Sequence, residues 1–444
     1  MGERVAVIGG GLAGTEAAWA LARADVDVDL YEMRPVRGTE AHRSDHLAEL
    51  VCSNSFRNDT LETAVGLLKE EMGRLGSLVM TVANRHRVPA GACLAVDRDR
   101  FAAELTARIE AEPRIRVVRE EVTAIPDGLT ILATGPLTSP ALSEALSTEL
   151  GSRHLYFYDA IAPTITADSI DMSIAWKASR YGKGGDDYIN CPLTEAEYVA
   201  FVDAVEAADK VPTREFERCV YFEGCMPIEE MAHRGRDTLA FGPMRPVGLD
   251  DPRTGRRPHA CLQLRQDDVE GHLFSMVGFQ TKMTHPEQRR VFRMIPGLAK
   301  AEFVRLGSLH RNTYVNSPEL LMPSLQVVSR RALWLAGQIV GVEGYVESAA
   351  TGIVAGMNAA RVLRGAPVVI PPPTTALGSL LIYVSQRAKG SFQPMNANYG
   401  LFPPLPRKLR GRAKKAAMAE RSFKDLARWQ AEVSGVAATH SSVG

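Results

Sequence analysis

Two cysteines lie in segments whose residue types could make a thiol reactive. Cys52 is followed at positions 53–55 by residues that favour turns and helix caps, and Cys225 comes two residues before Pro227, which favours the first turn of a helix. Because a helix N-terminus lowers the pKa of a nearby thiol, we expect both cysteines to lie beside helix starts as candidate catalytic nucleophiles. The alternative for either is a small buried hydrophobe. We expect that role for the other cysteines, Cys93, Cys191, Cys219 and Cys261.

A glycine fingerprint follows the first strand-like run of the chain. The pattern Gly9-x-Gly11-x-x-Gly14 comes after the apolar residues 5–8 and opens an Ala-rich segment. In a dinucleotide site the first glycine permits a tight turn, the second lets the backbone approach a pyrophosphate, and the third packs helix on strand. Glu32 ends the second strand, where its carboxylate can accept hydrogen bonds from ribose hydroxyls. The predicted cofactor-binding residues here are Gly9, Gly10, Gly11, Leu12, Ala13, Gly14 and Glu32.

Two later segments predict returns to the same nucleotide fold. Residues 128–136 and 332–337 are apolar strands that end at Gly135 and Gly337, and the second leads into a helix over 349–361. Either could be an ordinary strand end by itself, but three such segments are typical of proteins that wrap FAD rather than the shorter NAD. Gln338 stands where many flavoproteins have an aspartate. A helix start after this loop would favour an anionic reduced flavin. We therefore add Gly135, Gly337 and Gln338 to the predicted cofactor site.

A histidine and a basic run complete the candidate residues. His310 stands in a polar aromatic cluster before the third nucleotide segment, so it could touch a planar ligand stacked on the flavin, or it could be a structural histidine. Near the end of the chain, six cations stand together with no acidic residue among them. They could bind phosphate groups, or they could form a solvated helix face. They are Arg407, Lys408, Arg410, Arg412, Lys414 and Lys415.

The elements that must position these residues predict an α/β protein with a Rossmann-like FAD-binding domain, an inserted α+β domain and a helical C-terminal tail. We expect the FAD-binding domain at 1–155 and 329–366, the inserted domain at 156–328 and the tail at 367–444. Within the insertion, Ala260 to Arg265 and Leu273 to Phe279 predict a β-hairpin. The tail is expected to hold short helices and a frayed end from Gly435.

Composition limits the possible classes. With 444 residues and 45% hydrophobic residues the chain can build two cores, and 52 basic against 52 acidic residues give no bulk sign of nucleic-acid binding. No apolar run approaches the roughly 18 residues of a membrane span. The strand-like run from Arg4 leaves no room for a secretory leader, and no CxxC pair is present, so we expect a reducing cytoplasm and no metal site.

Taken together, these residues resemble the FAD- and folate-dependent tRNA uracil-5-methyltransferases of bacteria. The matching motifs run in order along nearly the whole chain. They are GGGLAGTEAA at 9–18, VCSNS at 51–55, ATGPLTS at 133–139, FGPMRPVGL at 241–249, HRNTY at 310–314 and GVEGY at 341–345. The sister family that installs a carboxymethylaminomethyl group on the tRNA wobble uridine is similar around the FAD segments. It is larger and its first glycine motif differs, so we rank it second.

The resemblance implies that NADH or NADPH reduces FAD, and that a one-carbon unit passes from 5,10-methylenetetrahydrofolate through the flavin to C5 of the T-loop uridine of tRNA. The family uses two cysteines whose motifs match Cys52 and Cys225. Uracil C5 becomes nucleophilic when a thiolate adds to C6. We assign this addition to Cys225 and the handling of the flavin-bound carbon or the C5 proton to Cys52, although the two roles could be exchanged. The resemblance also implies folate contacts by His310 and Tyr345 and flavin-edge contacts by Glu347 and Ser348.

The predicted partners are tRNA and tetrahydrofolate, with no membrane and no stable protein partner. Two other classes of function stay open at this point. One is a flavin oxidoreductase that acts on a small molecule, and the other is a flavoprotein that binds RNA without chemistry.

Overall fold

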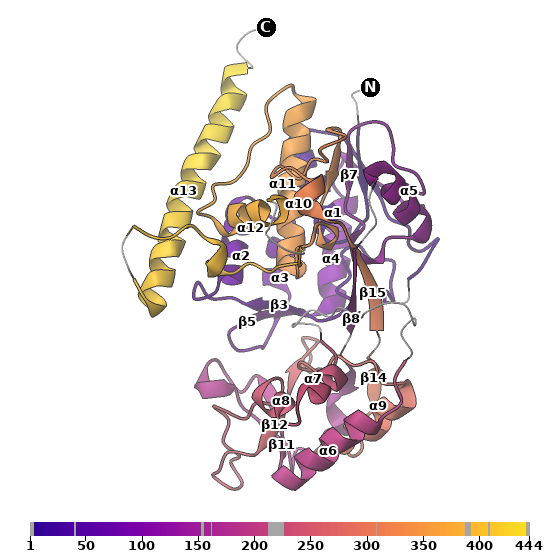
Figure 1. Ribbon diagram of the computed structural model, residues 1–444, viewed down its shortest axis with the longest axis vertical. Helices are drawn as coiled ribbons and strands as arrows, with labels where there is room; N and C mark the ends of the chain where they lie inside the picture. Colours follow the sequence, from indigo (N-terminus) through magenta and orange to yellow (C-terminus); the bar gives the residue numbers. More distant parts are fainter. Residues whose placement is uncertain are drawn as a thin grey trace.

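The computed structural model divides the chain into two bodies that lie end to end (Figure 1). It describes residues 4–39, 41–151, 155–160, 162–211, 226–307, 309–386, 392–406 and 409–440, with the backbone alone for 155–160, 309–313 and 434–440. Each body has its own hydrophobic core. The larger core draws residues from 5–150 and 314–419, and the smaller core draws residues from 165–301. The middle of the sequence is therefore inserted into a fold that the two ends of the chain complete.

A parallel five-stranded sheet forms the centre of the larger body, in the order β16-β7-β1-β2-β6. Its central strand β1 pairs with β2 on one side and β7 on the other, and Val5, Val7 and Ile8 are buried. Such continuous apolar runs suit a parallel sheet that is covered on both faces. This confirms the predicted Rossmann-like fold. The strands are β1 (Val5–Ile8), β2 (Val28–Tyr31), β6 (Ile115–Val118), β7 (Thr130–Leu132) and β16 (Leu333–Leu335).

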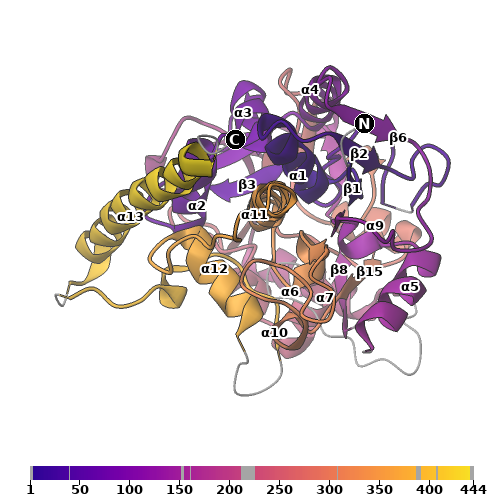
Figure 2. The same cartoon turned by 90° about the horizontal axis from the view of Figure 1, so that it is seen from above.

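Two helices, α1 (Leu12–Arg23) and α11 (Tyr345–Leu363), run side by side against this sheet (Figure 2). They approach closely because a Cβ atom on Gly352 would lie 2.1 Å from the carbonyl oxygen of Ala13, and one on Gly356 would lie 2.5 Å from that of Ala17. These two contacts advance in the same direction along both helices, so the helices are parallel. The first two turns of α11 consequently extend past the start of α1, toward the smaller body.

Further helices and a small sheet surround this centre. Glu71 on α2 connects them, since its carboxylate accepts hydrogen bonds from the backbone N–H groups of Ala376 and Leu377 and from the hydroxyl of Ser422. These elements are β3 (Ser55–Asn58), α2 (Ala64–Arg74), α3 (Leu78–Arg85), β4 (Arg87–Val88), β5 (Cys93–Val96), α4 (Arg98–Glu110), α5 (Pro140–Leu150), α10 (Ser317–Leu320), α12 (Ala376–Ser385) and α13 (Gly411–His440).

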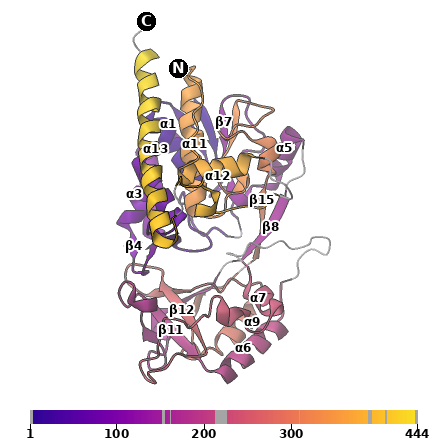
Figure 3. The same ribbon diagram turned by 60° about the vertical axis from the view of Figure 1, so that its left-hand side comes forward.

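The smaller body is a six-stranded antiparallel sheet with helices, in the order β10-β11-β12-β13-β9-β14. The predicted hairpin is confirmed as β12 and β13, which pair around the turn that follows Gln266. Two strands connect the bodies, because β8 (Leu155–Ala160) and β15 (Leu309–Tyr314) form an antiparallel pair between them (Figure 3). The other elements are β9 (Thr164–Thr166), β10 (Trp176–Lys177), β11 (Tyr188–Leu193), α6 (Glu195–Ala207), α7 (Ile228–Arg234), α8 (Thr238–Phe241), β12 (Ala260–Gln266), β13 (Leu273–Met276), α9 (His285–Phe292) and β14 (Phe303–Arg305).

The tail differs from the sequence expectation. The last helix, α13, continues to His440, so the predicted frayed end is wrong for residues 435–440, while 441–444 lie outside the described residues. The Ala-rich sequence favours helix throughout this segment, and the buried side chains of Met418, Leu426 and Trp429 fix its inner face. Figure 2 shows α13 on the outside of the larger body, beyond α2 and α12. Within the described ranges, no helix combines the length and the apolar character needed to cross a bilayer.

Candidate active site and dinucleotide site

The glycine turn between β1 and α1 has the geometry that its sequence predicts. Gly9 has a φ of +106°, and a Cβ atom there would lie 2.6 Å from the carbonyl oxygen of Ala133. A Cβ atom on Gly14 would lie 1.8 Å from the carbonyl oxygen of Gly9, so the helix packs directly on the turn. A Cβ atom on Gly11, by contrast, would have no atom within 4 Å apart from those of its neighbours in the chain. Space beside Gly11 is therefore open for a ligand to approach the backbone.

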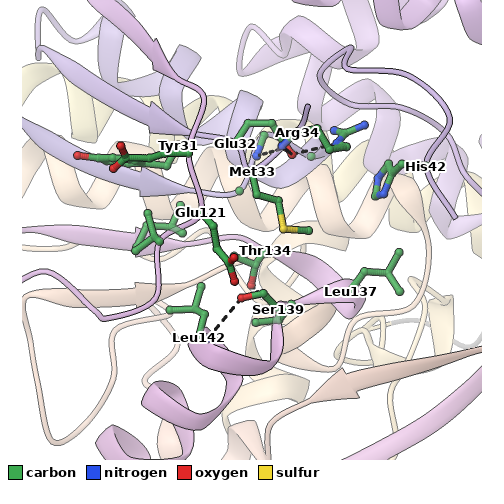
Figure 4. Close-up of a pocket in the computed structure, with 17 residues that line it drawn as sticks. Tyr31, Glu32, Met33, Arg34, His42, Glu121, Thr134, Leu137, Ser139 and Leu142 are labelled. Atoms are coloured by element: carbon green, nitrogen blue, oxygen red, sulfur yellow. Dashed lines mark hydrogen bonds and ion pairs between the residues drawn. The ribbon is translucent and has the colours of Figure 1, made fainter. Parts of the chain in front are cut away.

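A cavity opens at this turn and at the carboxyl ends of β1, β2 and β7 (Figure 4). This is the edge at which open α/β sheets bind their ligands. Residues from four separated segments line it (8–11, 31–42, 120–122 and 134–142), including four that the sequence did not single out by motif: Met33, Arg34, His42 and Glu121. Its full lining comprises Ile8, Gly9, Gly10, Gly11, Tyr31, Glu32, Met33, Arg34, His42, Glu120, Glu121, Val122, Thr134, Leu137, Thr138, Ser139 and Leu142.

Glu32 lies in this cavity as an ionised carboxylate. One oxygen, Oε2, accepts a hydrogen bond from the N–H of Gly10 (3.1 Å), and Oε1 accepts from the backbone N–H and the Nε of Arg34 (3.0 and 2.9 Å). Burial opposes ionisation, but the Arg34 guanidinium outweighs it and holds the pKa of Glu32 below its usual value. Glu32 therefore ties the glycine turn to the end of β2 and presents negative charge to the cavity.

The third nucleotide segment lies against the start of α1. A Cβ atom on Gly337 would approach the side chain of Ala13 to 3.0 Å, and the Gly337 N–H donates to Oγ1 of Thr351 (2.7 Å). Gln338 begins a short 3₁₀ turn, and Gly135 begins another after β7. The structure thus brings together the fingerprint, Gly135 and the 337–338 loop, which are distant in sequence.

The predicted flavin-edge residues Glu347 and Ser348 occupy the first turn of α11. Glu347 is fully buried, and its carboxylate accepts from Nη2 of Arg57 (2.5 Å) and from the backbone N–H of Ala397 (2.9 Å). Arg57 also donates to the carbonyl of Glu343 (2.9 Å). Both oxygens of Glu347 therefore have donors from this chain, and they hold the start of α11 in place.

Cys52 lies beside Tyr345, the first residue of α11. The Tyr345 hydroxyl oxygen accepts hydrogen bonds from the N–H groups of Cys52 (2.9 Å) and Ser53 (3.1 Å), and it lies 3.0 Å from the Cys52 Sγ. Burial is the main cause, and the nearby Cys52 sulfur the second, that raises the pKa of Tyr345 well above its ordinary value. Cys52 thus lies beside a helix start as expected, but the helix is the distant α11, because residues 53–55 lead into the strand β3 and not into a helix of their own.

The smaller body holds the loop that carries Cys52. Arg265 on β12 donates to Oδ1 of Asn54 (2.8 Å) and to Oγ of Ser53 (2.8 Å). In return, the amide nitrogen of Asn54 donates to the carbonyl of Gln266 (2.9 Å). The predicted hairpin therefore supplies the contacts that fix the turn after Cys52, which explains why strand geometry replaces a helix start there.

The remaining predicted residues fall into three groups. Cys225, Cys219, Arg407 and Lys408 lie outside the described residues, although α7 does begin directly after Pro227. His310 is placed by its backbone alone, on β15 opposite Asp159 of β8. The other tail cations stand at the start of α13, where Arg410, Arg412 and Lys414 are exposed, Lys415 is half-buried, and Arg412 pairs with Glu62 (2.9 Å).

The core-thiol interpretation is confirmed for Cys191 and Cys261. Both side chains are buried, on neighbouring strands β11 and β12. Burial raises the pKa of Cys261 to about 12 and that of Cys191 still further. Cys93, at the start of β5, is half-buried. Cys191 and Cys261 are consequently poor nucleophiles at neutral pH.

The fold and the site together define a two-body dinucleotide-binding protein with a half-buried thiol near the junction of the bodies. Residues 4–367 match the family described as glucose inhibited division protein A. A protein of Geobacter sulfurreducens, "Methylenetetrahydrofolate--tRNA-(uracil-5-)-methyltransferase TrmFO", is 59% identical over 97% of this chain and 99% of its own length. A protein of the same name from Moorella thermoacetica is 59% identical over 94% of this chain and 95% of its own.

The chain therefore belongs to the glucose inhibited division protein A family, on the branch formed by these TrmFO relatives. Among solved structures, GidA from Aquifex aeolicus matches with a TM-score of 0.72 and 18% identity, over 98% of this chain and 76% of that chain. At this identity the likeness shows the shared fold. The resemblance inferred from the sequence motifs is confirmed.

Proposed function

We propose that this protein methylates C5 of the T-loop uridine of tRNA, with FAD as its cofactor, 5,10-methylenetetrahydrofolate as the carbon source and NADH or NADPH as the reductant. The observation that carries the proposal is the Cys52–Tyr345 pair beside a complete dinucleotide turn, in a chain that aligns nearly end to end with methylenetetrahydrofolate-dependent tRNA uracil methyltransferases. Neither feature alone would separate methyl transfer from general flavin chemistry.

The residues at the glycine turn fit FAD. Gly11 leaves open space at the N-terminus of α1, where a pyrophosphate would be stabilised by backbone N–H groups and the helix dipole. Glu32 lies where it can accept hydrogen bonds from ribose hydroxyls, and the 337–338 loop packs against the start of α1 beside this turn. When bound, FAD would supply the reducing electrons that convert a methylene into a methyl group.

In the proposed chemistry, one thiol adds to the uracil ring and the other accepts a proton from it. The thiolate of Cys225 adds to uracil C6, so an S–C6 bond forms as the C5=C6 π bond breaks and its electrons move onto the C4 carbonyl oxygen. C5 then attacks the electrophilic methylene, so a C5–CH₂ bond forms while the π electrons of the methylene–nitrogen bond return to the carrier nitrogen. The Cys52 Sγ accepts the proton that C5 loses, and the CH₂–nitrogen bond breaks with its electron pair leaving on nitrogen. A hydride, which the reduced cofactor would supply, adds to the exocyclic methylene to make the methyl group, and expulsion of the Cys225 thiolate restores the C5=C6 double bond. The Tyr345 hydroxyl is proposed to hold the Cys52 sulfur in place for this transfer.

Other parts of the chain are proposed to hold the substrates. We retain His310 as a folate contact, and the cations at the start of α13 as phosphate contacts for tRNA. Tyr345 is reassigned from folate binding to Cys52. We also propose the division into an FAD-binding domain of residues 1–155 and 329–366, an inserted domain of 156–328 and a tail of 367–444. The separate second core supports the insertion. Residues 314–327, at the end of the proposed inserted domain, pack in the core of the larger body instead.

The test is mass spectrometry of an unmodified tRNA transcript after incubation with the protein, isotope-labelled methylenetetrahydrofolate and reduced nicotinamide. A labelled methyl group on the T-loop uridine would support the proposal. Label at the wobble uridine would favour the sister activity, and consumption of reduced nicotinamide without labelled RNA would favour a small-molecule oxidoreductase. The Gly11→Val variant, which should lose FAD, is the control for flavin dependence.

A further inference from the structure

An irregularity in the edge strand β14 determines where Arg305 points. Phe303 pairs with Ile165, and both pack in the core of the smaller body, but Arg305 pairs with Thr164, the very next residue of β9. Two steps along β14 therefore match one step along β9, which is a β-bulge, and Val304 is left half-exposed at 50%. Because side chains alternate along a strand, Arg305 would otherwise face the core as Phe303 does. The bulge turns it to the opposite face of the sheet.

That face of the sheet meets the loop that carries Cys52. Thr164 contacts Ser275 of β13 (3.1 Å between hydroxyl oxygens), and Ser275 accepts a hydrogen bond from Arg98 at the start of α4 (3.4 Å). Arg98 also donates to the carbonyl of Leu50, two residues before Cys52 (3.1 Å). Arg305 is thereby directed into the junction of the two bodies, within electrostatic range of Cys52 and Tyr345.

Arg305 differs from Arg98 in that none of the described residues forms an ion pair with it. Arg98 forms an ion pair with Asp267 (3.0 Å), which balances its charge. The Nη2 of Arg305 is buried and has no hydrogen-bond partner among the described residues. Burial, and then repulsion by Arg98, lower the pKa of Arg305 to about 10, so it is still a cation at neutral pH. Arg305 as a whole is half-buried, but a guanidinium with a buried, unpartnered nitrogen favours a nearby negative charge.

The Cys52 sulfur is the group placed to carry that charge. The Tyr345 hydroxyl oxygen already accepts two backbone N–H groups, so its own hydrogen is available to donate to the Sγ at 3.0 Å. Among the described residues, the charged or titratable groups that act on this sulfur include Tyr345 from α11, Arg98 from α4 and Arg305 from β14, while Asp267 pairs with Arg98 and the exposed Arg43 acts on Arg305. The two guanidinium groups and the Tyr345 hydroxyl favour a thiolate.

We propose that Arg305 is a positioning residue that keeps the Cys52 sulfur in its thiolate form at neutral pH, so that the sulfur can accept the C5 proton. The inference rests on the proposed function in giving the thiolate that task. Arg305 acts through Cys52, and the bulge in β14 is the feature that directs it there.

The test measures the thiolate of Cys52 directly in the flavin-loaded protein. Ultraviolet thiolate absorbance is recorded from about pH 5 to pH 10 for each protein and for the same protein carrying Cys52→Ser, and the difference gives the titration of Cys52. In the wild type we expect a midpoint below the ordinary thiol value of about 8.5. Arg305→Gln should raise the midpoint by roughly one pH unit, the effect of losing one nearby charge in a partly buried site.

Two further variants make the result decisive. Arg305→Lys keeps the charge and should restore most of the shift, whereas Arg290→Gln removes an exposed arginine of α9, paired with Glu287, and should leave the midpoint unchanged. An unchanged midpoint in Arg305→Gln would overturn the proposal, as would equal shifts in Arg305→Gln and Arg305→Lys. Should Arg305→Gln fail to fold, a wild-type midpoint at or above about 8.5, or a large shift in the folded Lys variant, would overturn it.

These titrations need neither tRNA nor folate. If the wild type fails to methylate tRNA but its midpoint responds to Arg305 as expected, the proposed function fails and the role of Arg305 stands. If methylation occurs but the midpoint does not respond to Arg305, the proposed function stands and the role of Arg305 fails.

Discussion

Replacing glycine with alanine at Gly11 and at Gly14 of the glycine turn should impair the protein for two different reasons. Gly11→Ala adds a methyl group that meets no atom within 4 Å apart from its neighbours in the chain, at an ordinary extended backbone (φ −76°), so the folded protein should lose no stability. Gly→Ala changes of this kind can even stabilise by about 0.4 to 1 kcal/mol. Gly14→Ala instead places a carbon 1.8 Å from the carbonyl oxygen of Gly9, more than an ångström inside any tolerated contact.

The magnitudes follow from these contacts. Relief at Gly14 requires a shift of α1 against the turn and against α11, and overpacking of this kind costs about 3 kcal/mol or more. At Gly11 the added methyl group meets the pyrophosphate instead, so FAD binding should fall while the apoprotein melts as the wild type does. The assay pairs the flavin absorbance per chain with thermal unfolding of the apoprotein. Full flavin content in Gly11→Ala, or an unchanged melting temperature in Gly14→Ala, would refute this explanation of the turn.

Three further predictions concern the thiols, the tail and a buried carboxyl. Cys52→Ala and Cys225→Ala should both retain FAD and lose methyl transfer, and only Cys225→Ala should fail to trap tRNA that contains 5-fluorouridine. Neutralising three cations of the 407–415 run should weaken tRNA binding and flatten its salt dependence by up to about 0.7 to 0.9 log units per lost contact. Burial raises the pKa of Glu71 to about 7, above its unfolded value near 4.5, so its contribution to stability is complete at low pH and is lost as the pH rises through 7. Glu71→Gln should flatten the pH dependence of the melting temperature between about pH 4.5 and pH 7.

Each of these has a contrary outcome. Cys261→Ala, in the core, is the control for the thiols and should keep most activity. Robust methylation by Cys225→Ala would remove the covalent assignment, and trapping lost only in Cys52→Ala would exchange the two roles. Unchanged tRNA affinity across a salt titration would return the basic run to a solvated helix face. A melting temperature that keeps its full pH dependence in Glu71→Gln would show that Glu71 is not the titrating group.

Much of the fold could be predicted because its signals are local. The spacing of Gly9, Gly11 and Gly14 follows from contacts within one strand, one turn and one helix, and the structure shows those contacts. The apolar strands 130–132 and 333–335 were recognisable because burial on both faces requires unbroken hydrophobic runs. The β12–β13 hairpin was predictable because its two strands and the turn between them are adjacent in the sequence. The family followed from motifs that keep their order along the chain.

The site, in contrast, depends on contacts between residues far apart in sequence. Cys52 meets Tyr345 across 293 positions, and the loop after Cys52 is shaped by Arg265 from the inserted body. The sequence near Cys52 suggested a helix start because Ser and Asn favour caps, but these contacts favour a different backbone. No local pattern marks Arg305, because a one-residue bulge, and not its position in the sequence, decides which face of the sheet it occupies. The sequence by itself determined the strands, the glycine turn and the family, whereas only tertiary packing decided which side chains surround the thiol, because that depends on how two separately cored bodies meet.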